Sequence, residues 1–149
     1  MGMKTLVYDP YLDIDYINNN NIKSVNSVEK LIKDDIDILV LTLPLTDSTR
    51  GIINTDLINK AKKNMVIVNT SRALIVDQES LIYLLQQKKI KAYLTDVLEE
   101  EPMIKDHPLL NFNNVIITPH IGSRTYESVQ RQGTMAVNNL LKFLNKWEK

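Results

Sequence analysis

The sequence contains no cysteine, which excludes disulfides, thiolate nucleophiles and cysteine-ligated metal sites. Its two histidines, His107 and His120, lie too far apart for the usual ligand spacing of a zinc site. No apolar run reaches the roughly 18 residues that span a bilayer, and the start has no apolar signal segment. The formal net charge of zero gives no sign of electrostatic nucleic-acid binding. We therefore expect a cytoplasmic protein that binds neither membranes nor nucleic acids.

Glycine is scarce as well, and the chain has only four: Gly2, Gly51, Gly122 and Gly133. No Gly-x-Ser-x-Gly elbow is present, which argues against a serine hydrolase. The Gly-x-Gly-x-x-Gly turn, which binds phosphates at the start of a helix, is also absent. A phosphate-bearing ligand therefore lacks its usual glycine-rich cradle in this chain.

What is present is typical of an ordinary globular domain. With 149 residues, 44% of them apolar and 24% charged, the chain is long enough for one domain with its own core. Apolar and β-branched runs predict strands, which are Lys4–Tyr8, Ile22–Val25, Ile36–Leu43, Met65–Val68, Ile90–Thr95 and Val115–Thr118. The run at 36–43 is almost continuous and stops at Pro44, which predicts a strand buried on both faces.

Helical periodicity and capping residues predict the helices between these strands. They are Ser27–Lys33 with Ser27 as its N-cap, Asn54–Ala61, about a dozen residues capped by Asp77, and the long closing helix Arg124–Trp147. Residues 11–21, rich in asparagine, predict a weak helix or a loop. The alternation of strands and helices indicates an α/β fold with a doubly wound parallel sheet.

Polar side chains follow three of the predicted strands. Arg72, Asp96 and His120 each come just after a strand, and the carboxyl ends of parallel strands meet in one crevice. A histidine oriented by a carboxylate is an acid/base near neutral pH, and a guanidinium fork fits a substrate carboxylate.

Each of these residues also has a plainer interpretation. Arg72 could equally form a surface salt bridge, and a lone histidine such as His120 is more often structural. The acidic run at 99–101 is typical of a solvated surface, and nothing in its composition singles out Glu101. Asp9 suits an acidic ribose-binding position at a strand end, although an Asp-Pro turn is the commoner explanation. We interpret His107 as structural.

Taken together, these residues resemble the D-isomer-specific 2-hydroxyacid dehydrogenase family, phosphoglycerate dehydrogenase-like members included. Six motifs carry the resemblance in order: Val7–Pro10, Leu43–Thr46, Val68–Arg72, Leu94–Asp96 through Glu101–Pro102, His107–Leu110 and Ile117–Gly122. Their spacing also matches, with 24 positions from Arg72 to Asp96 and 5 from Asp96 to Glu101. The resemblance implies an NAD-dependent oxidoreductase acting on a small 2-hydroxy or 2-oxo acid.

The resemblance also implies roles for individual residues. The catalytic residues would be Arg72, which pairs with the substrate carboxylate, His120, the acid/base, and Glu101, which orients His120. Asp96 would hold the nicotinamide carboxamide, and Asp9 the ribose. The full set of NAD-binding positions implied is Asp9, Pro44, Thr46, Thr70, Ser71, Arg72, Asp96, His120 and Gly122.

The family's glycine-rich turn and its substrate-binding domain have no counterpart in the sequence. We therefore expect residues 1–149 to form a partial NAD-binding domain, an incomplete Rossmann-type sheet that lacks the first strand, with a closing helix. In the strand order 3-2-1-4-5-6 the absent strand lies between the strands at 4–8 and 36–43, leaving two unpaired edges unless these strands pair directly. The closing helix should expose an apolar stripe. Activity should depend on a missing N-terminal half or on a homo-oligomer.

Two other functions remain open at this point. Corepressors of the C-terminal-binding-protein type resemble this family, keep its site residues and act mainly by binding partners, so a non-catalytic NAD-binding or protein-binding module is the alternative. Formate dehydrogenases are also similar, but they have glutamine where this chain has Glu101. Turnover separates the enzyme from the binding module.

Overall fold

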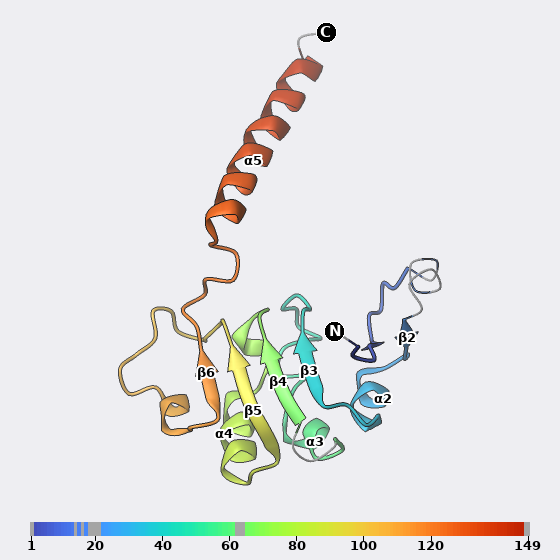
Figure 1. Ribbon diagram of the computed structural model, residues 1–149, viewed down its shortest axis with the longest axis vertical. Coiled ribbons are helices and arrows are strands. Elements are labelled where there is room, and N and C mark those ends of the chain that lie inside the picture. Colours follow the sequence, from blue (N-terminus) through green and yellow to red (C-terminus); the bar gives the residue numbers. More distant parts are fainter. Residues whose placement is uncertain (1, 14, 16, 18–21, 62–64, 148–149) are drawn as a thin grey trace.

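The computed structural model describes residues 2–13, 15, 17, 22–61 and 65–147 (Figure 1). Strands and helices alternate along these residues, and the strand pairs are all parallel. The strands are β1 (Leu6–Val7), β2 (Lys23–Ser24), β3 (Ile38–Leu41), β4 (Met65–Asn69), β5 (Ile90–Thr95) and β6 (Val115–Ile117). The predicted α/β fold with a parallel sheet is confirmed, with most strands shorter than predicted.

The helices begin where the sequence places capping side chains. They are α2 (Val28–Lys33), α3 (Thr55–Ile58), α4 (Gln78–Gln86) and α5 (Tyr126–Trp147), with 3₁₀ turns η1 (Ala73–Ile75) and η2 (Pro108–Asn111). Ser27, Asn54 and Asp77 each accept a hydrogen bond from a backbone N–H of the first turn, which satisfies a donor that the helix itself leaves unpaired. The prediction for residues 11–21 falls largely outside the described residues.

The strands form two sheets rather than one. β3, β4, β5 and β6 lie side by side in sequence order, and β1 pairs with β2 in a separate two-stranded sheet. Within the described residues, β3 pairs only with β4 and β1 only with β2. The direct pairing of β1 with β3 does not occur, and the expected unpaired edges are confirmed. Figure 1 shows the two-stranded sheet apart from β3.

The core lies on one face of the four-stranded sheet. Buried side chains of alternate strand positions pack there against α2, α3 and α4: Leu39, Leu41, Met65, Ile67, Tyr93, Ile32, Leu57, Ile58, Leu81, Leu84 and Leu85. The predicted burial of β3 on both faces is wrong, because Ile38 and Val40 expose 48% and 55% of their surface. On β6, Ile116 is likewise exposed. An apolar run therefore marks β3 correctly as a strand of a parallel sheet, yet no described segment covers its second face.

Helix α5 extends away from the sheets (Figure 1). Its apolar side chains each expose between 47% and 58% of their surface: Val129, Met135, Val137, Leu140, Leu141, Phe143 and Leu144. At 100° per residue all but Met135 fall on one side of the helix, so the expected apolar stripe is confirmed. No helix in the described part of the chain is long and apolar enough to cross a membrane.

Candidate active site

Three polar side chains lie at the carboxyl ends of neighbouring strands. Arg72 follows β4, Asp96 follows β5, and His120 follows β6 after two further residues. Because these strands are adjacent and parallel, their loops share one edge of the sheet, as predicted. This edge is where ligands bind in open α/β sheets.

His120 forms a close pair with Glu101. The Nδ1 atom of His120 lies 2.7 Å from Oε2 of Glu101, and Oε1 of Glu101 accepts a hydrogen bond from the backbone N–H of Leu98 at 2.9 Å. The structure thus singles out Glu101 from the acidic run, where composition alone could not. Since Nδ1 is engaged, Nε2 is the ring nitrogen that remains to exchange a proton with a substrate.

The environment of Glu101 keeps its carboxylate ionised. The hydrogen bond from the Leu98 N–H, followed by the one with His120, lowers the pKa of Glu101 below its ordinary value. An ionised carboxylate on Nδ1 fixes the orientation of the imidazole ring. The pair therefore has the arrangement of an acid/base with an orienting group.

Asp96 stabilises the loop that carries His120 through three hydrogen bonds. Its Oδ1 accepts from the Thr118 hydroxyl at 2.5 Å and from the Ile121 N–H at 2.9 Å, and its Oδ2 accepts from the Gly122 N–H at 2.8 Å. Burial alone would raise the pKa of the Asp96 carboxyl, but these hydrogen bonds and nearby His120 outweigh it and lower the pKa. The contact with a nicotinamide carboxamide, implied by the resemblance, stays a prediction.

The loop at His120 has an unusual backbone. His120 has a φ of 53°, a left-handed conformation that non-glycine residues rarely adopt outside constrained sites. A Cβ atom at Gly122 would lie 2.9 Å from Oδ2 of Asp96, closer than van der Waals contact allows. Glycine at this position therefore permits the Asp96 carboxylate to approach the loop and hold His120 in place.

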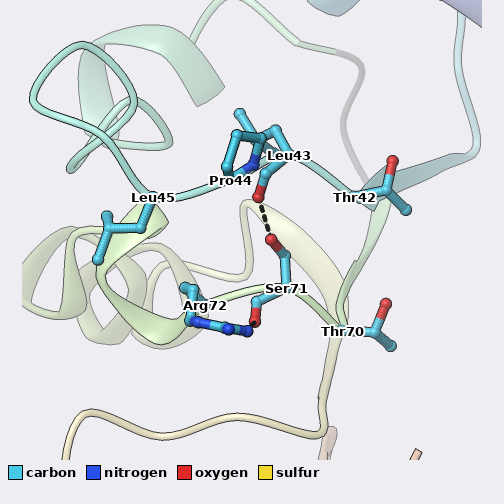
Figure 2. Close-up of a pocket in the computed structure, with 7 residues that line it drawn as sticks. All are labelled: Thr42, Leu43, Pro44, Leu45, Thr70, Ser71 and Arg72. Atoms are coloured by element: carbon cyan, nitrogen blue, oxygen red, sulfur yellow. Dashed lines mark hydrogen bonds between the residues drawn. The ribbon is translucent and has the colours of Figure 1, made fainter. Parts of the chain in front are cut away.

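Arg72 lines a separate cavity of about 600 Å³ with Thr42, Leu43, Pro44, Leu45, Thr70 and Ser71 (Figure 2). Buried Asn69 fixes this loop, since its side chain donates to the Arg72 carbonyl and accepts from the Ser71 N–H. The Ser71 hydroxyl donates to the Leu43 carbonyl, joining the loops after β3 and β4. The Arg72 guanidinium is exposed and donates to the Ser71 carbonyl at 2.7 Å. The described residues give it no acidic partner, so the surface salt bridge is not found.

The remaining predicted cofactor residues lie at the edge of this region or apart from it. The Thr46 side chain forms hydrogen bonds within its own loop, to Ser48 and Thr49, beside Pro44. Asp9, at the end of β1 on the separate sheet, accepts from the Tyr11 N–H at 2.8 Å. Asp9 thus forms the turn that an Asp-Pro dipeptide favours, and its ribose-binding role stays a prediction.

Two features of the site were not predicted from the sequence, whereas the structural role of His107 was. Thr118 was given no role, although its position just before Pro119 and His120 was the available signal. It also missed a cavity of about 700 Å³ next to His120, which is lined by side chains from the 98–124 region. His107 is structural as predicted, since it is buried and accepts from the Leu109 N–H at the start of η2. Within the described residues no group of three potential ligands could hold a metal ion.

Known proteins are similar to this chain in sequence and in fold. The family described as "D-isomer specific 2-hydroxyacid dehydrogenase, NAD binding domain" matches residues 1–122. The D-3-phosphoglycerate dehydrogenase of Methanocaldococcus jannaschii is 39% identical over 96% of this chain. The hydroxypyruvate reductase of Blautia hydrogenotrophica is also 39% identical, over 97% of the chain. The crystal structure of Aquifex aeolicus D-lactate dehydrogenase with NAD and lactic acid superimposes with a TM-score of 0.81 at 29% identity, over 97% of this chain.

The chain is shorter than each of these proteins. It spans 27% of the phosphoglycerate dehydrogenase, 44% of the hydroxypyruvate reductase and 47% of the D-lactate dehydrogenase.

Proposed function

The chain belongs to the D-isomer-specific 2-hydroxyacid dehydrogenase family, and from this premise we propose that it supplies the acid/base and carboxylate-binding groups of an NAD-dependent oxidoreductase. The substrate is a small 2-hydroxy or 2-oxo acid. The observation that carries the proposal is the 2.7 Å contact between His120 and Glu101 at the carboxyl edge of the sheet, with Arg72 at the same edge after β4, two strands from β6. The absence of cysteine suits a reducing compartment, so we place its work in the cytoplasm.

The residues present fit part of an NAD molecule. The loop after β3 offers apolar side chains at Leu43, Pro44 and Leu45 to the cofactor, and the Asp96 and Gly122 loop suits the nicotinamide end. In the described part of the chain no glycine-rich turn at a helix N-terminus faces this crevice for the pyrophosphate. We therefore expect weak NAD binding by the chain alone.

Each site residue has a distinct task in the reaction. When bound, NADH supplies the hydride that reduces the carbonyl carbon. Arg72 binds the carboxylate of the 2-oxo acid in a bidentate manner and polarises the carbonyl. Protonated His120 donates the proton on Nε2 to the carbonyl oxygen, and in the reverse direction neutral His120 accepts it from the hydroxyl. Glu101 accepts the Nδ1–H and holds the ring in place through the transfer.

We propose that activity requires a strand–turn–helix unit between β1 and β3. Both strands present unpaired edges there, and the order 3-2-1-4-5-6 places the phosphate-binding strand at this position. A further segment or a separate polypeptide would contribute it.

The test is NADH oxidation with glyoxylate, pyruvate and hydroxypyruvate. It compares the chain alone with the chain co-expressed with the part of the Blautia hydroxypyruvate reductase that this chain does not match. We expect turnover only in the completed protein, and its loss in His120→Ala. NADH binding without turnover of any of the three acids in the completed protein would instead favour the non-catalytic module.

A further inference from the structure

We propose that Asn69 and Tyr93, two buried residues of β4 and β5, are positioning residues that hold Arg72 in place to bind the substrate carboxylate. The inference rests on the proposed function, since it takes Arg72 as the group that binds the carboxylate. Neither Asn69 nor Tyr93 lines the cavity beside Arg72, so both act through the backbone of the loop that carries it.

Asn69 is the last residue of β4 and lies where the alternation of the strand favours an apolar side chain. Positions 65, 67 and 69 are all buried, and Asn69 has no exposed surface. A buried amide costs free energy unless hydrogen bonds satisfy it, and even then it contributes little more to stability than an apolar group of the same shape. A polar side chain at this position therefore has a role beyond filling the core.

The hydrogen bonds of the Asn69 side chain indicate that role. Its Nδ2 donates to the Arg72 carbonyl at 3.0 Å, and its Oδ1 accepts from the Ser71 N–H at 3.1 Å. A backbone carbonyl only accepts and a backbone N–H only donates, so these two partners fix the orientation of the amide. The other hydrogen bond of Nδ2 goes to the Tyr93 hydroxyl at 3.2 Å. The amide thus joins the Arg72 loop to Tyr93.

Tyr93 anchors Asn69 from the core. It pairs with Ile67 in the register of β4 and β5, so its side chain lies on the same buried face as Asn69, two residues earlier along the strand. Only 2% of its surface is exposed, and the surrounding core fixes the ring. Without the hydroxyl, one buried N–H of Asn69 has no acceptor, and the amide is free to turn away from the loop.

The backbone of Asn69 connects the same support to the acid/base. Its carbonyl accepts from the Asp96 N–H at 3.0 Å and from the Thr95 hydroxyl at 3.2 Å. Asp96 in turn holds the loop of His120 through its carboxylate. One buried residue therefore contacts the loop of Arg72 and the strand end that fixes His120, and it sets where the two functional groups lie relative to each other.

The test variant is Tyr93→Phe, which removes a single oxygen and keeps the ring in the core. Tyr83→Phe, at an exposed tyrosine of α4, is the matched control. Amide hydrogen exchange of the chain alone measures the protection of the Ser71 N–H. The Val66 N–H, which donates to the Asp37 carbonyl at 2.9 Å, is the internal control. We expect Tyr93→Phe to speed exchange at Ser71 about 3- to 10-fold more than at Val66, and Tyr83→Phe to change neither rate.

Kinetics of the completed protein then separate positioning from a general loss of folded protein. A displaced Arg72 binds the carboxylate less well, so we expect Tyr93→Phe to raise KM for glyoxylate about 3- to 10-fold and to leave kcat close to the wild-type value. A purely structural role would instead lower the apparent kcat at unchanged KM, because fewer molecules would be folded.

Two results would overturn the inference. Exchange that changes no more at Ser71 than at Val66 would show that Tyr93 does not hold the loop in particular, and an unchanged KM would show that Arg72 does not depend on it. The exchange measurement needs no turnover, which separates the inference from the proposed function. Selective exchange at Ser71, in a chain whose completed form oxidises no NADH, would refute the proposed function and leave the positioning of Arg72 standing.

Discussion

At the scale of single residues, the Glu101 carboxylate determines what His120 can do. It holds Nδ1 of the ring at 2.7 Å, and its own second oxygen is fixed by the Leu98 N–H. Glu101→Gln keeps the shape but replaces an ionised acceptor with a neutral amide, so we expect kcat of the completed enzyme to fall by about 100-fold. Glu100→Gln, an exposed neighbour, is the matched control and should keep the full rate. Equal rates for both variants would refute the role of Glu101.

Asp96 should control the stability of the chain in acid. Its pKa in the folded protein is lowered, so the stability that its ionised form contributes is present above the unfolded pKa and is lost as the pH falls through the folded pKa. Asp96→Asn removes this contribution and leaves backbone donors poorly paired, costing about 1–3 kcal/mol at neutral pH. Urea unfolding between about pH 7 and pH 2 measures both effects.

In that series the wild type should lose stability on the acid side more steeply than Asp96→Asn. Parallel curves for the two proteins would contradict the assigned hydrogen bonds.

At the scale of elements, the 118–122 loop depends on Gly122 approaching Asp96. Gly122→Ala places a Cβ atom 2.9 Å from Oδ2 of Asp96, so the loop must shift, and we expect destabilisation by about 1–3 kcal/mol with loss of the His120–Glu101 geometry. Gly133→Ala is the opposite case, because nothing lies within 4 Å of its Cβ position in α5. That substitution should stabilise the helix by up to about 1 kcal/mol. Thermal unfolding of both variants measures the contrast.

The same loop shows how far the sequence could be used for prediction. The position of Arg72, Asp96 and His120 at one edge of the sheet could be predicted, because the carboxyl ends of parallel strands all lie at the same edge. The hydrogen-bond partners of Asp96 could not be predicted. Its hydrogen bonds to Thr118, Ile121 and Gly122 depend on the left-handed backbone conformation of His120, which no periodicity in the sequence reveals. Burial of β3 was also mispredicted, because an apolar run records what a strand can bury and not which segments are present to cover it.

At the scale of the whole molecule, two apolar surfaces lack a cover in the described chain. One is the second face of the sheet at Ile38, Val40 and Ile116, and the other is the stripe on α5. Such surfaces favour association, so we expect concentration-dependent oligomers of the chain in light scattering. Leu140→Lys on the stripe should reduce association, whereas Met135→Lys on the opposite side of α5 should not. A monodisperse monomer at all concentrations would contradict this expectation.

The unpaired edges of β1 and β3 make a related prediction for cofactor binding. The chain alone should bind NADH weakly, because the described residues offer the pyrophosphate no glycine-rich turn at a helix N-terminus. Completing the sheet with a glycine-rich strand–turn–helix should strengthen binding at least 10-fold. NADH fluorescence titration of the chain with and without that unit measures the difference. Equal NADH affinity in both forms would show that a strand between β1 and β3 has no part in cofactor binding.

The proposed proton transfer by His120 is tested by the rate at which the completed protein oxidises NADH with hydroxypyruvate. We expect His120→Ala to lower kcat by at least 100-fold. A His120→Ala variant that oxidises NADH at the wild-type rate would show that His120 does not transfer the proton.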